Sequence, residues 1–563
     1  MNNLSKILFK TLSGDNAKVT TTDICNYYRS FGSAGYHAAT NIVINKLKEI
    51  GINDVKIKKY PLDGEYKKLN QKMPYAWEPY NASLSIVNPI QEEIVNLNST
   101  PSCLAWWSMP TKNGGETRRL IDVGYGENDN DYIGKQIKDN FVFIKGTDIP
   151  DGWRHAAIKS MEKGAKGLIT DYLFYPTYPF RTRESVPDAV QLLRLPNQFG
   201  KYNSWGCSID YNSSIKLQNL LKLGDVYINA DIQCKLFKGE GVNVEATIPG
   251  SKYPEECVMF IAHTSAGTRP GANCAAGPAL MLEIARSINE LIKNKIIPEP
   301  IRSIKFLFIA EGKGSNVYID DNLKKINNIK TIFCFDSVGH HQDKLNSNLM
   351  FYKHPDSSPS FINDFFVDII EKIPKETSWV FKNDNDISLI KFLTAPYTVW
   401  SDNHTWAAFG VPSPLIMSWP DKYFHTQLLT PDNTDPRVFK QCGIATALAA
   451  LEIANFSKST FCRISNIIFN NSKYRLNKIK IEFLECLNIG DDYFTNNIYK
   501  SHSDYFINKV EYTAKIDIET IKSLNNLIKT TDFSFYKKTS NELINRIKNE
   551  KNEIIEYINK NIK

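Results

Sequence analysis

The chain has 563 residues, of which 42% are hydrophobic and 23% are charged. This composition is that of a globular protein, and the length suffices for about two to four domains with a large core. The formal net charge of +7 is a small excess for this length, and no dense run of lysine and arginine with interleaved aromatic residues is present. We therefore expect no nucleic-acid partner.

The cysteines and the apolar segments favour a cytoplasmic protein. Ten cysteines are present, none forms a CxxC pair, and several lie in apolar runs such as TIFCFD. Buried free thiols in a reducing compartment are the simplest interpretation. The N-terminal apolar stretch is too short for a signal peptide, and we find no run of about 18 apolar residues that would cross a membrane.

Residues 1–95 are predicted to form the first part of an α/β domain. Apolar residues recur at helical spacing over residues 20–50, which predicts one helix there, and DVKIKKYPL alternates as a strand does. Residues 96–238 have a different character, because DNFVFIKG is typical of a strand and GWRHAAIKSMEKGAKGLITDY of a helix followed by a strand. Aromatic residues and prolines crowd residues 171–188. Since this segment is too long for a lid loop, we expect an inserted β-rich domain.

Residues 239–456 return to strand–helix alternation. NVEATIPG, CVMFIAH, SIKFLFIAEG, IKTIFCFDSVG and SPLIMSW are short apolar runs bounded by turns, as central strands are. GPALMLEIARSINELI and TALAALEIANF have the apolar spacing of helices. This alternation predicts a three-layer αβα sandwich.

Residues 457–563 are predicted to form a helical region rich in lysine and asparagine. One helical stripe contains Leu543, Ile547, Ile554, Ile558 and Ile562. We interpret the region as a packing domain, and oligomerisation or partner binding through these helices is the alternative.

Four polar side chains follow predicted strands or lie in a nearby loop, namely His263, Glu311, Asp336 and His425. In α/β sheets, ligands bind at the carboxyl ends of the strands. Imidazole and carboxylate groups suit zinc, and a further carboxylate can take a proton from a water that the metal activates. From these residues alone, a metal site and a set of structural polar groups are equal alternatives.

Several motifs resemble those of the MH-clan zinc aminopeptidases, M28-type exopeptidases whose relatives include glutaminyl cyclase, glutamate carboxypeptidase and the transferrin receptor. The motifs are GSAGYHAATNIVINKLKEIGINDVKIKKYPLDG, NVEATIPGS with VMFIAH, PGANCAAGPALMLEIAR, RSIKFLFIAEGKGS, FCFDSVG and SWPDKYFHTQLLTPDNTDP. They span roughly residues 20–95 and 240–455. The resemblance implies a zinc-exopeptidase-like sandwich, an inserted protease-associated (apical) domain, and a peptide or amide-containing small substrate.

Carried over by position, the resemblance implies roles for the four polar residues. His263 and Asp336 would bind one zinc ion, and His425 would bind a second. Glu311 would be the general base.

The sequence departs from the family pattern at four positions. Asn273 stands where a bridging aspartate is expected, and Gly312 stands where a metal-binding glutamate often follows the base. Ser265 replaces the aspartate that orients the first histidine, and Leu429 replaces an aspartate after the last one. Two zinc ions about 3.5–4 Å apart need an anionic bridge, so we expect one ion at most. Its affinity should be weak, because loss of an orienting carboxylate costs about 10–100-fold.

Three further residues are candidates for lesser roles. Asn273, Asp402 and His404 are candidate substrate-binding residues, although a structural hydrogen bond is the favoured interpretation for Asp402 and His404. Cys274 lies at a predicted helix start, where a thiolate is favoured, and is either a nucleophile or a small apolar filler.

The sequence therefore leaves two functions open. The protein is either an aminopeptidase-like hydrolase with an incomplete, at most mononuclear zinc site, or an inactive pseudo-peptidase. In the second case the exopeptidase fold would serve as a binding or scaffolding protein, because a fold alone does not establish a function.

Overall fold

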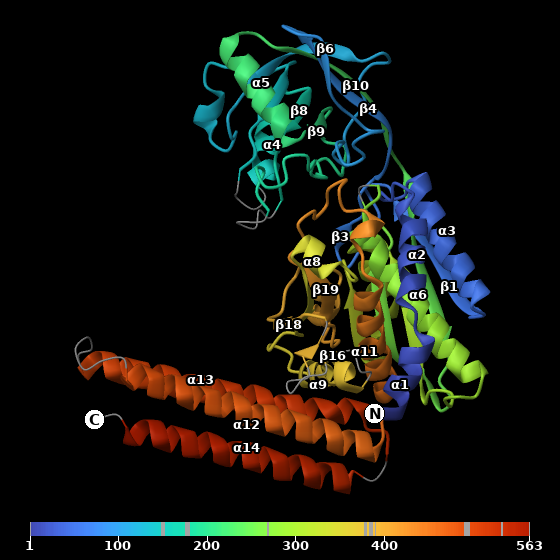
Figure 1. Ribbon diagram of the computed structural model, residues 1–563, viewed down its shortest axis with the longest axis vertical. Helices are drawn as coiled ribbons and strands as arrows, with labels where there is room; N and C mark the ends of the chain where they lie inside the picture. Colours follow the sequence, from blue (N-terminus) through green and yellow to red (C-terminus); the bar gives the residue numbers. More distant parts are fainter. Residues whose placement is uncertain are drawn as a thin grey trace.

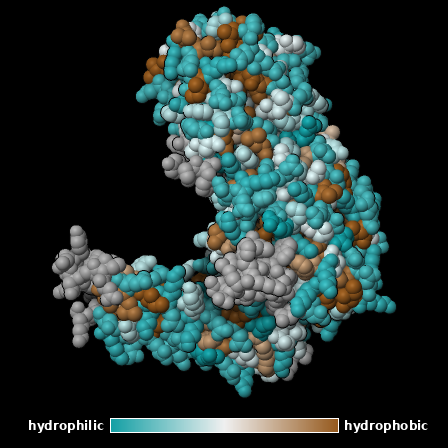
Figure 2. Space-filling view, viewed as in Figure 1, coloured by the Kyte–Doolittle hydropathy of each residue, from teal (hydrophilic) through white to brown (hydrophobic). Residues whose placement is uncertain are grey.

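The computed structural model describes residues 2–147, 152–174, 181–266, 269–376, 380–381, 387–388, 390–488, 496–530 and 533–561. Within these residues, an α/β sandwich lies between a second, inserted sheet at one end of the molecule and a bundle of long helices at the other (Figure 1). The two outer parts extend to the same side, which gives the molecule a C-shaped outline (Figure 2).

An eight-stranded mixed sheet forms the centre of the described sandwich, in the order β1-β11-β13-β12-β14-β19-β15-β18. Its strands are β1 (Asp54–Leu62), β11 (Gly239–Ile248), β12 (Tyr253–His263), β13 (Arg302–Ile309), β14 (Ile329–Phe335), β15 (Asn348–Tyr352), β18 (Phe392–Ala395) and β19 (Leu415–Trp419). β13, β12, β14 and β19 run parallel to one another, whereas β11 is antiparallel to both β1 and β13, and β15 is antiparallel to β19. The apolar runs that predicted central strands do form them.

Alternate residues of β12 face two different cores. Phe260 packs in the larger core on one face, and Met259 and Ile261 pack in a smaller core on the other. The larger core contains helices α1 (Asn2–Thr11), α2 (Gly14–Cys25), α3 (Ala34–Glu49), α6 (Ala272–Lys293), α9 (Ile362–Glu376) and α11 (Pro436–Ala454). The smaller core contains residues of α7 (Lys313–Asn322) and α10 (Asn403–Ala408). The expected three-layer αβα sandwich is therefore confirmed.

The single helix predicted over residues 20–50 is wrong, because α2 and α3 are separate helices. Gly32 lies in the break with φ of 71°, and the Ser33 side chain caps α3 by accepting a hydrogen bond from the Tyr36 amide at 3.1 Å. The apolar spacing continues across the break, so periodicity alone did not reveal it. Serine is a favoured N-cap, and this signal marks the start of α3.

The inserted sheet has seven strands in the described residues, in the order β5-β4-β10-β6-β7-β8-β9. These are β4 (Ala76–Asn88), β5 (Glu92–Asn96), β6 (Glu116–Asp122), β7 (Phe141–Ile144), β8 (Gly167–Thr170), β9 (Trp205–Ser208) and β10 (Tyr227–Phe237), with helices α4 (Gly152–Glu162) and α5 (Tyr211–Leu223). β4 lies before residue 96, where the inserted domain was expected to begin. The boundaries at 95/96, 238/239 and 456/457 stay predictions.

The helical C-terminal region is confirmed. Its long helices are α12 (Lys458–Asn488), α13 (Asn496–Ser523) and α14 (Ser534–Lys560), which pack on one another and project from the sandwich (Figure 1). The predicted stripe is buried at Leu543, Ile547, Ile554 and Ile558, and Ile562 lies outside the described residues. No helix among the described residues combines the length and apolarity needed to span a bilayer.

Short elements complete the described chain. They are η1 (Asp129–Tyr132), η2 (Leu323–Asn328), η3 (Pro431–Asn433), η4 (Leu524–Leu527), α8 (Gln342–Leu345), β2 (Lys67–Lys68), β3 (Gln71–Lys72), β16 (Val380–Phe381) and β17 (Ile387–Ser388).

A buried ion-pair cluster joins the C-terminal region to the central sheet. Glu256 on β12 is 2% exposed and lies 2.7 Å from Arg302 Nε and 2.7 Å from Lys330 Nζ. Arg302 also donates a 2.7 Å hydrogen bond to the Leu527 carbonyl in η4. Because the guanidinium bridges Glu256 and η4, the carboxylate ties β12 of the central sheet to the connection between α13 and α14.

We expect Glu256→Gln to lower the free energy of unfolding by about 3–5 kcal/mol, since it leaves the buried charges of Arg302 and Lys330 uncompensated. The control is Glu255→Gln at the neighbouring exposed residue, which should change stability by less than about 0.5 kcal/mol. Urea unfolding followed by circular dichroism measures both variants. Equal stability of the Glu256→Gln and Glu255→Gln variants would show that the ion-pair cluster does not stabilise the fold.

Candidate metal centre

Three of the predicted site residues lie at one edge of the central sheet. His263 ends β12, Glu311 follows β13 and Asp336 follows β14. β12 lies between β13 and β14 and runs parallel to both. The carboxyl ends of the three strands therefore meet, as the strand-end rule predicts.

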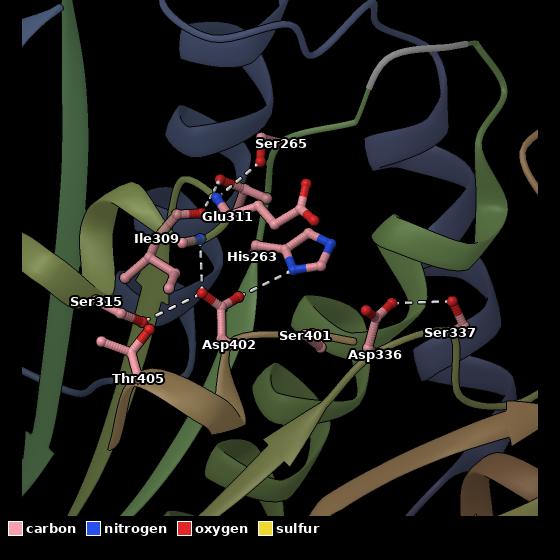
Figure 3. A network of polar contacts seen from close by, with 12 residues as sticks. His263, Ser265, Ile309, Glu311, Ser315, Asp336, Ser337, Ser401, Asp402 and Thr405 are labelled. Atoms are coloured by element: carbon pink, nitrogen blue, oxygen red, sulfur yellow. Dashed lines mark hydrogen bonds and ion pairs between the residues drawn. The ribbon is translucent and has the colours of Figure 1, made fainter. Parts of the chain in front are cut away.

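His263 is held by a carboxylate on its far side. Its Nδ1 lies 3.1 Å from Asp402 Oδ2, and both side chains are buried. Asp402 Oδ1 also accepts hydrogen bonds from the Gly312 amide at 2.7 Å and from Ser315 Oγ at 3.1 Å. Figure 3 shows the other ring nitrogen of His263 on the side of the ring that faces away from Asp402. A carboxylate that binds one imidazole nitrogen fixes the tautomer and presents the other nitrogen to a metal.

Asp402 thus supplies the orienting carboxylate that was expected to be missing at Ser265. Ser265 has a different role, because its Oγ accepts a hydrogen bond from the Glu311 amide at 3.0 Å (Figure 3). The expectation that His263 lacks carboxylate support is therefore wrong. The support comes from a distant segment of the chain rather than from the residues that follow the histidine.

Cys274 completes a three-residue group with His263 and Asp336. One ligand atom from each residue lies within 4.8 Å of the others. Imidazole nitrogen, thiolate sulfur and carboxylate oxygen are all zinc ligands, so this donor set fits the metal. Burial opposes protonation of His263, but the charge of Asp336 and the contacts with Asp402 and Cys274 outweigh it and raise the pKa of His263 well above its ordinary value. The group therefore attracts positive charge.

A buried arginine binds the segment that precedes α6, the helix that contains Cys274. Arg29 is 0% exposed and donates hydrogen bonds to the Thr264 carbonyl at 3.0 Å and to the Gly271 carbonyl at 2.9 Å. Gly271 precedes α6 with φ of 49°, and Cys274 lies in the first turn of that helix. Asn273 lies in the same turn, but its side chain is outside the described part of the structure, so its predicted substrate contact stays a prediction.

His425 does not join this group in the described residues. It follows β19 in a loop, with φ of 54°, and its ring stacks on Phe424 with a centroid distance of 3.8 Å. Burial and the nearby positive charge of Arg194 lower the pKa of His425 to about 3. The structure thus brings together two of the three predicted metal ligands, adds Cys274, and places His425 beside Arg194 and Glu311.

The inserted domain holds the His425 loop in place. The Leu192 amide donates to the His425 carbonyl at 2.8 Å, and Gln191 Nε2 donates to the same oxygen at 3.1 Å. Arg181, which is 1% exposed, donates to the Phe424 carbonyl at 2.9 Å. The inserted domain therefore forms part of the site rather than a separate unit.

Arg194 of the inserted domain forms an ion pair with Glu311. Its guanidinium lies 5.0 Å from the ring centroid of Trp106, a fully buried side chain that restricts its position. Burial raises the pKa of Glu311, but the charge of Arg194 outweighs it and lowers the pKa to about 2. Arg194 was not among the predicted site residues, because QLLRLP carries no motif and Arg194 lies 117 residues before Glu311.

A pocket of about 360 Å³ opens beside this ion pair. His404 lies in the pocket wall, with its Nδ1 2.6 Å from the Ser401 carbonyl. Asp402 is not a lining residue of this pocket and contacts His263 instead. The roles of His404 and Asp402 in substrate binding stay predictions.

The fold is that of known zinc aminopeptidases. A zinc aminopeptidase from Bacillus subtilis is 17% identical, and the match covers 80% of this chain and 97% of that one with a TM-score of 0.55. A Peptidase M28 precursor from Shewanella amazonensis is 17% identical over 81% of this chain and 98% of its own, with a TM-score of 0.56. An aminopeptidase from Aneurinibacillus sp. is 18% identical over 79% and 96%, with a TM-score of 0.51.

The expected resemblance to M28-type exopeptidases is thereby confirmed at the level of the fold. A protein of Clostridium acetobutylicum matches 93% of this chain and 97% of its own length, with 14% identity and a TM-score of 0.53. Neither a protein-family model nor a curated protein sequence matches the chain.

If Cys274 is a metal ligand, cobalt(II) bound to the protein should show thiolate-to-metal charge-transfer absorption. Cys274→Ser should abolish that absorption and weaken cobalt binding by at least about tenfold, since one of three protein ligands loses its thiolate. Titration followed by visible absorption measures both effects. Cys486→Ser, at an exposed thiol, is the control and should keep the spectrum. Absorption that survives in Cys274→Ser would remove Cys274 from the ligand set.

Proposed function

We propose that the protein is a hydrolase of peptide or amide bonds that works with one zinc ion, held by His263, Cys274 and Asp336. The observation that carries the proposal is the His–Cys–Asp group, whose buried histidine is oriented by Asp402. The zinc aminopeptidases that share the fold support zinc as the metal and peptides as the substrates.

When bound, the zinc ion would supply a Lewis acid that polarises the amide carbonyl. The residues of this chain have the remaining tasks. Asp402 keeps Nδ1 of His263 protonated, so that the other ring nitrogen is free to bind. Glu311 accepts the proton of the attacking water. Arg194 must first leave Glu311, because a carboxylate with a pKa of about 2 is a poor base near neutral pH.

Arg194 also explains why the site needs only one metal ion. The expected carboxylates at positions 273 and 312 are absent, and the permanent charge of the guanidinium acts on both Glu311 and His425. A second divalent cation beside His425 would be repelled by this charge and would have no anionic bridge. We propose that Arg194 takes the electrostatic place of the second metal.

Three further features belong to the proposal. We propose a cytoplasmic location, because eight of the ten cysteines are free and buried, as expected for a reduced protein. We propose that the inserted domain is of the protease-associated type, from its position over the site. We propose oligomerisation through the C-terminal helices, whose exposed Tyr474 and Tyr505 offer contact area.

The function is tested by zinc content and amide hydrolysis in the full-length protein. We expect about one equivalent of zinc and hydrolysis of a peptide panel that includes blocked and free N-termini. Glu311→Gln should keep the zinc and lose about 10²–10⁴-fold in rate. The control Glu240→Gln, at an exposed residue of β11, should retain both. Protein that binds no zinc and hydrolyses none of the panel would instead favour a binding or scaffolding role.

The role of Arg194 is tested by restoring the missing carboxylates. The double variant Asn273→Asp with Gly312→Glu should still bind one zinc ion, because Arg194 remains. Adding Arg194→Met should allow two. A Cβ at Gly312 meets no atom within 4 Å, although its φ of 66° strains a side chain there. Metal content of folded, dialysed protein measures the stoichiometry, and two ions in the double variant would contradict the proposed role.

A further inference from the structure

The pocket beside the candidate metal centre lies between two parts of the chain. The inserted domain contributes Trp107, Arg154, Arg194, Gln198 and Phe199, among others. The sandwich contributes Phe31, Glu311, Lys313, Trp400 and His404, among others. Glu311 belongs both to the candidate metal centre and to the pocket wall. A molecule bound in the pocket therefore lies next to the proposed general base.

The charge of the pocket is strongly positive. Its cationic lining residues are Lys72, Arg154, Arg194 and Lys313. Among the described lining residues, Glu311 is the single carboxylate, and it is already paired with Arg194. An ammonium group that entered the pocket would therefore meet repulsion and no anionic partner of its own.

Two of these cations have no carboxylate partner in the described residues. Lys72 pairs with Glu65 at 3.5 Å, and Arg194 pairs with Glu311, but Arg154 and Lys313 form no ion pair. Burial and the charge of Arg194 lower the pKa of Lys313 and outweigh the opposing effect of Glu311. An anion in the pocket would offset the positive charge beside Lys313, and Arg154 lines the same pocket, so both side chains can contact one ligand.

The rest of the pocket is apolar. Phe31, Trp107, Phe199 and Trp400 line it together with Pro74 and Pro196. A ligand that fits this lining combines an apolar or aromatic part with a negatively charged group.

We propose that the pocket binds the carboxylate of an amide substrate, through Arg154 and Lys313. This inference rests on the proposed hydrolase function and narrows its substrate class. The preferred substrate is an acyl amino acid or acidic peptide with a blocked or distant amine, rather than a peptide held by its free N-terminus. The same carboxylate competes with Glu311 for Arg194, which releases the base when the correct substrate binds.

Binding is measured by calorimetry on full-length protein in chelator-treated buffer, so that no turnover occurs. The probes are four matched dipeptides, N-acetyl-Phe-Glu amide, N-acetyl-Phe-Gln, N-acetyl-Phe-Gln amide and Phe-Glu amide with a free amine. N-acetyl-Phe-Glu amide carries a side-chain carboxylate, N-acetyl-Phe-Gln carries a terminal carboxylate, and N-acetyl-Phe-Gln amide carries neither. The comparison therefore shows whether the pocket binds a side-chain or a terminal carboxylate. At least one acidic acetylated probe should bind about tenfold more tightly than the neutral one. The free-amine probe should bind more weakly than its acetylated form.

The double variant Arg154→Gln with Lys313→Gln should abolish the preference, and rising salt should reduce it in the unaltered protein. The control is Lys222→Gln on α5, outside the pocket, which should keep the preference. Equal binding of the acidic and neutral probes, a preference that survives in the double variant, or binding of inorganic phosphate but of no carboxylate would overturn the inference.

The readouts separate this inference from the proposed function. Charge-dependent binding by a protein that takes up no zinc would contradict the hydrolase proposal alone. Zinc uptake and hydrolysis without any preference for carboxylate probes would contradict the substrate class alone.

Discussion

The charge balance at the carboxyl edge of β12, β13 and β14 governs the candidate site. Three neighbouring strands bring His263, Glu311 and Asp336 to one place, and the inserted domain adds the guanidinium of Arg194. Asp336 and Glu311 need positive charge near them, because carboxylates are costly to bury alone. In this protein the Arg194 guanidinium provides one positive charge beside Glu311, and the proposed zinc ion would provide the positive charge beside Asp336.

A permanent guanidinium in this position changes the chemistry available to the site. Unlike a metal ion, Arg194 does not exchange with solvent, and it holds Glu311 in an ion pair before any substrate arrives. In the proposed hydrolase, activity would depend on a ligand that draws the arginine away from Glu311. The inserted domain would thereby take part in the proposed reaction, since Trp106 contacts the arginine and the Leu192 amide binds the His425 carbonyl.

The sequence predicted the sandwich and the edge where the site lies, because both follow from local patterns. Short apolar runs predicted β12, β13 and β14, and the strand-end rule then placed His263, Glu311 and Asp336 together. The contacts that define the chemistry could not be predicted in this way. Asp402 reaches His263 across 139 residues, and Arg194 reaches Glu311 across 117. No periodicity or motif in one sequence encodes such pairs, and the break between α2 and α3 was missed although Ser33 signals it.

The most direct test is a crystal structure of the full-length protein grown with excess zinc, with anomalous scattering measured at the zinc absorption edge. We predict one anomalous peak in this site, contacted by His263, Cys274 and Asp336, with the Arg194 guanidinium still beside Glu311. Two neighbouring peaks, the second bound by His425 with Arg194 displaced, would contradict the account.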